Sequence, residues 1–66
     1  MKVTINGTVK ELPNISYLSE IVTQYCKEPK HVITEVNGQI IPANLWGNTA
    51  LKDGDTIELV AFVGGG

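Results

Sequence analysis

One stretch of this 66-residue chain carries the apolar spacing of an α-helix, and the segments on both sides of it have the pattern of β-strands. Leu18, Ile21, Val22 and Tyr25 fall at positions i, i+3, i+4 and i+7, so they share one face of a helix. A chain of this length buries only about 60% of the surface that its unfolded form exposes, so its elements must share one core. A single amphipathic helix can bury its stripe only by lying across one face of a sheet.

The residues that flank this helix set its expected ends. Ser16 is the expected N-cap, because a serine hydroxyl can accept a hydrogen bond from the free backbone N–H groups of the first turn. The helix is then expected to run over residues 17–26. It stops before Pro29, since proline lacks a backbone N–H and clashes with the preceding turn.

Two short strands joined by a tight turn are expected before the helix. Residues 2–5 alternate polar and apolar side chains, and residues 8–12 have the composition of a returning strand. Asn6-Gly7 between them is the strongest short signature of a type I′ hairpin turn, because both central positions of that turn need a positive φ. The chain therefore opens with a β-hairpin.

Three more strands follow the helix, and each is bounded by residues that favour turns. Asn37-Gly38 repeats the hairpin signature, Pro42 closes a short strand, and the polar turn 52–55 precedes the longest strand. The expected strands cover residues 32–36, 39–41 and 56–63, and residues 43–47 are irregular or form a single helical turn.

The resulting order is two strands, one helix and three strands. The first and last strands are natural central partners, because both are apolar at alternate positions and neither contains proline. We therefore expect an α+β fold in which a mixed four- to five-stranded sheet packs on one main α-helix, the β-grasp arrangement of ubiquitin. Residues 1–63 are expected to form this single domain.

The last three residues, Gly64, Gly65 and Gly66, follow an apolar strand without a polar cap. Glycine loses more conformational freedom on ordering than any other residue, so residues 64–66 are expected to form a mobile tail that projects from the domain. Without side chains, such a tail fits a narrow channel. Its only reactive group is the α-carboxylate of Gly66, which is ionised at neutral pH and inert until another protein activates it.

The base of this tail is expected to belong to the interface with the activating protein. A three-residue tail extends only about 10 Å, at roughly 3.3–3.6 Å per residue, so the activating site must approach the domain closely. Side chains alternate along a strand, which places Val60 and Phe62 on the face of Glu58. If Glu58 faces solvent, Val60 and Phe62 form an exposed apolar patch, and we expect them to dock the partner proteins.

Composition argues against several other classes of function. The net charge is −2 and no basic cluster is present, so nucleic acid is not an expected partner. No apolar run approaches the ~18 residues of a membrane span, and the N-terminus does not have the pattern of a signal peptide. The single cysteine, Cys26, cannot form an internal disulfide, which favours a cytoplasmic location. No nucleophile–base grouping or phosphate-binding loop indicates catalysis by the domain itself.

Several individual residues have both a functional and a structural interpretation. Asp53 and Asp55 suit a turn better than a metal site, since no third or fourth oxygen ligand is suggested nearby. His31 is expected on a surface loop, and Trp46 is either an interface anchor or part of a packing cluster. Cys26 is either a redox or persulfide-accepting thiol or a small apolar packing residue with no adjacent base to lower its pKa.

Three motifs in the second half of the chain carry a resemblance to a known family. They are Asn37-x-x-Ile40-Ile41-Pro42-x-x-x-Trp46, the turn Lys52-Asp53-Gly54-Asp55, and the end Gly64-Gly65-Gly66. In this order they resemble the ThiS family of sulfur carriers of thiamin biosynthesis, and the likeness covers the whole chain. MoaD, the small subunit of molybdopterin synthase, shares the turn and the diglycine end. The short length and the first motif favour ThiS.

The resemblance implies a role for Gly66 and a set of partner proteins. A ThiF-like adenylyltransferase uses MgATP to convert the Gly66 carboxylate to an acyl-adenylate. A persulfide sulfur, supplied ultimately by a cysteine desulfurase, displaces AMP and leaves a thiocarboxylate. A ThiG-like thiazole synthase then takes that sulfur into the thiazole ring. The resemblance implies that the chain is a co-substrate, with no cofactor or metal of its own, and not an enzyme.

Two other interpretations of the sequence remain open. A MoaD-type carrier delivers sulfur to molybdopterin or another acceptor by the same chemistry. A ubiquitin-like binding module that is never activated, or a tail that is only a linker stub, makes no use of the Gly66 carboxylate. A residue added after Gly66 distinguishes a carrier from a module, because only the carrier needs the carboxylate free.

Overall fold

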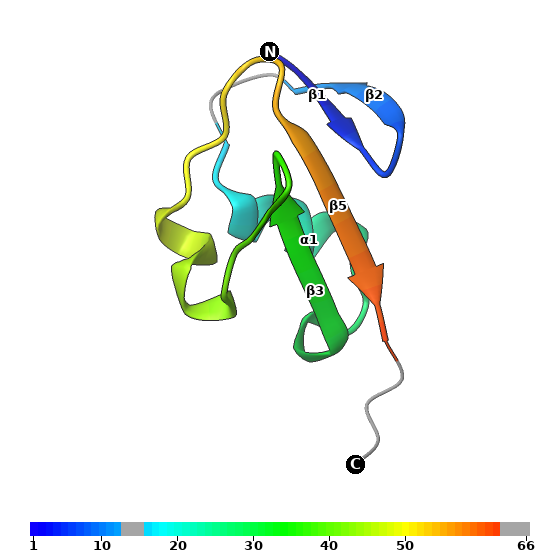
Figure 1. Cartoon of the computed structure of the whole chain (residues 1–66), viewed down its shortest axis with the longest axis vertical. Coiled ribbons are helices and arrows are strands. Elements are labelled where there is room, and N and C mark those ends of the chain that lie inside the picture. Colours follow the sequence, from blue (N-terminus) through cyan, green and yellow to red (C-terminus); the bar gives the residue numbers. More distant parts are fainter. Residues whose placement is uncertain (13–15, 63–66) are drawn as a thin grey trace.

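The computed structural model describes residues 1–12 and 16–62, and its elements follow the predicted order (Figure 1). The strands of this part of the chain are β1 (Lys2–Ile5), β2 (Thr8–Glu11), β3 (Val32–Val36), β4 (Gln39–Ile40) and β5 (Thr56–Ala61). Its helices are the α-helix α1 (Leu18–Tyr25) and the 3₁₀ helices η1 (Pro29–His31) and η2 (Ala43–Asn48). The last strand ends at Ala61, earlier than predicted, and Val63 lies outside the described residues.

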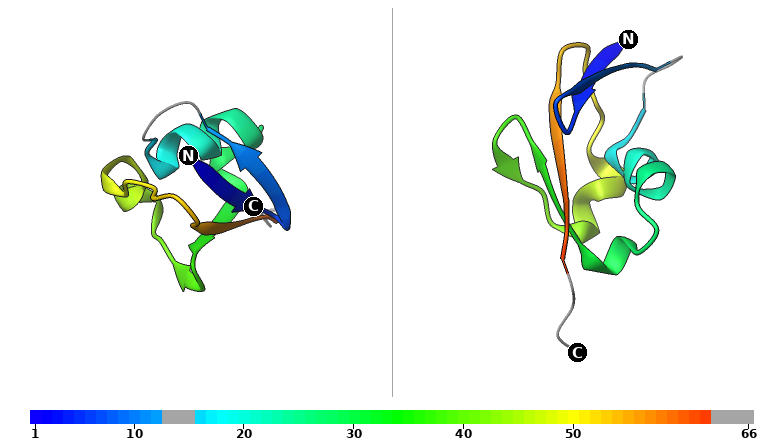
Figure 2. Two further views of the ribbon diagram at one scale, coloured as in Figure 1. Left: turned by 90° about the horizontal axis from the view of Figure 1, so that it is seen from above. Right: turned by 90° about the vertical axis from the view of Figure 1, so that its right-hand side faces the viewer.

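The strands form one mixed sheet in the order β2-β1-β5-β3-β4. β1 and β5 run parallel, with Ile5 opposite Ile57, and the other neighbouring pairs are antiparallel. α1 packs on one face of this sheet, which the right-hand view of Figure 2 shows nearly edge-on. The β-grasp fold and the pairing of the first strand with the last are therefore confirmed.

Both Asn-Gly pairs form the predicted hairpin turns. Asn6 and Gly7 have φ values of 48° and 81°, and Asn37 and Gly38 have 52° and 86°. Two consecutive positive φ values define a type I′ turn, whose twist matches that of the flanking strands. Asparagine and glycine are the residues that adopt this conformation at least cost.

Ser16 is not the N-cap of the helix, which is a correction to the sequence analysis. The N-cap is Tyr17, whose backbone is extended and forms an isolated β-bridge to the loop after η2. In the same loop, Leu51 N–H donates to the Ser16 carbonyl, and the Thr49 carbonyl accepts from Leu18 N–H, both at 2.8 Å. Pairing with this loop holds the chain extended through Tyr17, so the helix begins at Leu18.

The core lies between α1 and the inner face of the sheet. Leu18, Ile21 and Val22 are buried as predicted, whereas Tyr25 is 40% exposed and does not belong to the core. Tyr25 is the last residue of an eight-residue helix, and its ring lies 5.9 Å from the Lys10 ammonium. The predicted stripe is therefore correct for its first three members and wrong for the fourth.

Trp46 belongs to the packing cluster that was one of its two interpretations. Its side chain is buried with the core, and its indole Nε1–H donates a hydrogen bond to the Ile41 carbonyl at 2.9 Å. A buried indole needs such a partner for its single donor. None of the helices in the described part of the chain has the length and apolar character that crossing a membrane requires.

Candidate functional site

The candidate site begins where β5 ends. β5 is the middle strand of the sheet and its last residue is Ala61. Phe62 follows as the last described residue. The predicted tail, Gly64, Gly65 and Gly66, lies outside the described residues, so the structure presents the site up to the base of that tail.

Val60 lies on the face of the sheet that points away from α1, and it is 51% exposed. Its cross-strand partner Ile33 is 43% exposed, so the two side chains form an apolar surface over β3 and β5. Glu35 and Glu58 are the next opposed pair on this surface. Carboxylates directly opposite each other on antiparallel strands repel. This outer face, Ile33, Glu35, Glu58 and Val60, is suited to a partner that presents apolar groups beside a cation.

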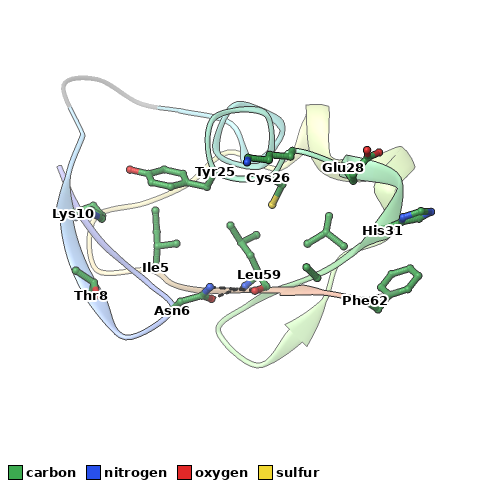
Figure 3. Close-up of a pocket in the computed structure, with 13 residues that line it drawn as sticks. Ile5, Asn6, Thr8, Lys10, Tyr25, Cys26, Glu28, His31, Leu59 and Phe62 are labelled. Atoms are coloured by element: carbon green, nitrogen blue, oxygen red, sulfur yellow. Dashed lines mark hydrogen bonds between the residues drawn. The ribbon is translucent and has the colours of Figure 1, made fainter. Parts of the chain in front are cut away.

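Phe62 departs from the alternation expected for it. Its ring lies on the same side of the strand as Leu59 and points toward His31 (Figure 3). The ring centroids of Phe62 and His31 are 5.7 Å apart, and the planes are inclined by 45°. Because β5 ends at Ala61, strand geometry no longer fixes the direction of the next side chain. Phe62 is 42% exposed, as expected, but it does not extend the patch around Val60, and the docking role of both residues stays a prediction.

A pocket of about 670 Å³ adjoins Phe62 on the inner side of the sheet (Figure 3). Its lining includes Ile5, Leu59 and Ala61 from the strands and Tyr25, Cys26 and His31 from the segment that begins at the end of α1. This pocket could not be predicted from the sequence, because its residues come from separate segments that no local pattern connects. His31 is exposed, as expected, and it borders the pocket beside the base of the tail.

Cys26 lines the pocket as a half-buried free thiol. Burial raises its pKa above the ordinary value, because desolvation disfavours the charged form. The thiolate is the nucleophilic form of cysteine, so a raised pKa lowers its reactivity at neutral pH. These surroundings favour the packing interpretation of Cys26 over the reactive one.

The side chains of two turn asparagines hold β5 from opposite sides. On the β1 side, the Asn6 amide accepts a hydrogen bond from Leu59 N–H (2.7 Å) and donates one to the Leu59 carbonyl (3.1 Å). On the β3 side, the Asn37 amide oxygen accepts from Thr56 N–H at 2.9 Å. The sequence identified both asparagines through their turn conformation alone and missed these contacts, which join residues distant in the chain.

Asp53 and Asp55 form the turn that starts β5. The buried Asp55 carboxylate accepts hydrogen bonds from Lys52 N–H (2.7 Å) and from Asn37 Nδ2 (3.0 Å). Asp53 accepts one from Lys2 N–H at 2.6 Å. In the described part of the chain, no group of three or more His, Cys, Asp or Glu side chains could hold a metal ion. The two aspartates have the hydrogen-bonding role of turn residues.

Comparison with known proteins identifies relatives along the whole chain. The model of the ThiS family matches residues 3–66. The sulfur carrier protein ThiS of Bacillus subtilis is 38% identical over 63 residues, which are 94% of this chain and 96% of that protein. The crystal structure of the thiamine biosynthesis protein (ThiS) of Geobacter metallireducens superposes with a TM-score of 0.86 at 28% identity, covering 100% of both chains.

A further relative is much longer than this chain. A thiazole synthase of Paramagnetospirillum magneticum is 32% identical over 66 residues. The match covers 100% of this chain and 20% of that protein, so the chain spans about a fifth of its length.

Proposed function

The chain belongs to the ThiS family of sulfur carriers of thiamin biosynthesis, and we propose that it carries sulfur as a thiocarboxylate at Gly66. The observation that supports this proposal is the extent of the family match, which runs to residue 66 and includes the glycine end. We assign residues 1–63 to the domain and residues 64–66 to the tail that enters the partner's active site.

The carboxylate is activated by a ThiF-like adenylyltransferase. A Gly66 oxygen attacks the α-phosphorus of MgATP, and pyrophosphate leaves. A persulfide sulfur then attacks the acyl carbon, and AMP leaves with the oxygen. A thiol cleaves the resulting disulfide bond, so that the sulfur remains on Gly66 and the thiol takes up the other half. The domain supplies the acyl group for this sequence, and the ATP and Mg²⁺ belong to the partner.

A ThiG-like thiazole synthase is the proposed acceptor of the sulfur. The similarity of this chain to one fifth of a thiazole synthase supports the pairing, because it places a carrier-like segment in the same polypeptide as that activity. A thiocarboxylate held on a protein delivers sulfur at the acceptor's site, so free sulfide is not required. A cysteine desulfurase is the proposed ultimate source of the persulfide.

The outer face is the proposed docking surface for these partners, together with Phe62 at the base of the tail. The exposed Val60 and Ile33 provide apolar contact area close to the end of β5. The opposed Glu35 and Glu58 carboxylates repel each other in the free domain, so a partner's cation placed between them is attracted by both and relieves this repulsion. This arrangement places the proposed docking surface beside the end of β5.

Intact-protein mass spectrometry tests the proposal. The chain is incubated with a ThiF-like enzyme, MgATP and a persulfide donor, and the expected product is heavier by the difference between one sulfur and one oxygen atom, with the change located at Gly66. A matched variant with one alanine after Gly66 should show no such product at the glycine. If the enzyme modifies another carrier but leaves this chain unchanged, activation by a ThiF-like enzyme is contradicted, and the chain either has a different activating partner or is a binding module.

A further inference from the structure

Phe62, the last described residue before the tail, contacts His31 outside the sheet through both its backbone and its ring. The β3–β5 ladder ends with Val32 opposite Ala61. One step further, the Phe62 N–H donates a hydrogen bond to the His31 carbonyl at 2.8 Å, and the two rings are 5.7 Å apart. His31 therefore holds both the backbone and the side chain of the last described residue before the tail.

The segment that presents His31 is itself constrained. η1 begins at Pro29, whose ring fixes φ, and the His31 N–H donates to the Glu28 carbonyl at 2.9 Å. β3 starts at the next residue, Val32, which is buried. The backbone of His31 is therefore held on both sides, and its ring contact with Phe62 starts from a constrained backbone position.

The pocket offers Phe62 a competing position. The ring is 42% exposed and stands at the edge of a pocket of about 670 Å³, whose lining combines apolar side chains such as Ile5 and Leu59 with charged ones such as Lys10. Moving an exposed aromatic ring into such a pocket gains free energy through the hydrophobic effect. If the ring turned inward, it would lose its contact with the His31 ring. The contact with His31 opposes that movement.

We propose that His31 is a positioning residue for sulfur loading: it holds Phe62 at the rim of the pocket and so fixes the point from which the tail reaches the activating site. The proposal rests on the proposed function, because the position of Phe62 matters only if the Gly66 carboxylate must enter an activating site. Residues 63–66 span at most about 14 Å at 3.3–3.6 Å per residue. Because these four residues extend so short a distance, variation in the position of Phe62 lowers the fraction of molecules whose Gly66 carboxylate can enter the partner's active site.

The first test uses the free protein and needs no partner. His31→Ala keeps the backbone carbonyl that accepts from Phe62 N–H and removes only the ring contact, so NMR of this variant should show a more mobile Phe62 ring with new contacts to Leu59 or Cys26. His31→Phe, which retains an aromatic ring, should restore the original contacts. Tyr25→Ala is the control, because Tyr25 is also an exposed aromatic residue that lines the pocket but lies at the end of α1. Unchanged Phe62 mobility in His31→Ala overturns the proposal.

The second test measures activation by the ThiF-like enzyme. His31→Ala should raise KM about fivefold and leave kcat unchanged, as expected when binding must order one additional side chain. His31→Phe should restore KM, and Tyr25→Ala should not change it. In a Phe62→Ala background, His31→Ala should have no further effect, because it acts through Phe62.

The outcomes separate the two proposals. Additive effects of the His31 and Phe62 substitutions on KM, or a normal KM for His31→Ala, overturn the positioning role while the carrier function stands. A wild-type chain that the enzyme does not activate contradicts the carrier function, and the NMR measurement then decides by itself whether His31 holds Phe62.

Discussion

The two ends of β5 are held in different ways. At its start, the Asp55 carboxylate is buried and accepts hydrogen bonds from Lys52 and Asn37, and its backbone carbonyl accepts another from β1. Beyond its other end, Phe62 has one backbone hydrogen bond and one ring contact, both to His31. The first end is fixed by buried polar groups, and the second leaves large apolar side chains exposed.

Along β5, the residues at the start therefore contribute mainly to the stability of the domain, and the exposed residues toward the end are available for binding a partner. Buried and paired polar groups contribute to folding, because leaving one unpaired costs its full desolvation. Exposed apolar groups contribute little to the free domain and can contribute to a complex. Substitutions at the start of β5 should therefore change stability, and substitutions toward its end should change partner affinity.

The largest expected effect is at the start of the strand. Asp55→Ala removes the two carboxylate oxygens that accept hydrogen bonds from Lys52 N–H and Asn37 Nδ2. These two donors then lack their partners, so the free energy of unfolding should fall by about 3 kcal/mol. Asp53→Ala is the matched control in the same turn. It loses one exposed hydrogen bond and should cost about 1 kcal/mol or less. Urea denaturation measures both losses, and equal losses would show that the buried Asp55 carboxylate stabilises the fold no more than the exposed Asp53 carboxylate.

A smaller loss of stability is expected when the side chain of Asn6 or Asn37 is removed, and the two variants should expose different amides of β5 to exchange. Asn6→Gly retains the positive φ of the turn but removes the two hydrogen bonds to Leu59, and it should cost about 1–2 kcal/mol. Hydrogen exchange should accelerate most at the Leu59 amide. Asn37→Gly is the paired variant and should accelerate exchange at the Thr56 amide instead. Acceleration of both amides by either variant would show that the two ends of β5 are not held independently.

The smallest expected effect has the opposite sign. Glu58→Gln removes the repulsion with Glu35, so it should raise the free energy of unfolding by about 0.5 kcal/mol at low salt, and the gain should fade at high salt. The same variant should bind the ThiF-like enzyme more weakly. Glu20→Gln is the control, since Glu20 lies in the first turn of α1, where a negative charge is favourable. A loss of stability in Glu58→Gln contradicts the repulsive pair.

The sequence predicted the features that depend on neighbouring residues. The Asn-Gly turns follow from the φ values that only a few residues tolerate, and the strand limits follow from those turns. The pairing of β1 with β5 could also be predicted, because both strands are apolar at alternate positions and lack proline. The glycine tail was identified from composition, and the match to the ThiS family reaches its last residue.

Apart from the pairing of β1 with β5, the features that depend on contacts between distant residues could not be predicted. Ser16 has the residue type of an N-cap, but pairing with the loop after η2 keeps the chain extended through Tyr17. Tyr25 has the spacing of a core residue, but the helix ends there and the ring borders the pocket. The contact of Phe62 with His31 joins residues from different elements. No pattern within one segment records such contacts.

The place of β5 in the sheet has a consequence for how the chain folds. The middle strand is the last one in the sequence, and its contacts with the first hairpin join residues 53 positions apart, as between Asn6 and Leu59. Contacts of such long range slow folding, because a long loop must close before they form. A nascent chain on the ribosome lacks the centre of its sheet until β5 has emerged. The domain therefore cannot fold before β5 has been synthesised, and a chain truncated before Thr56 exposes its core to proteases.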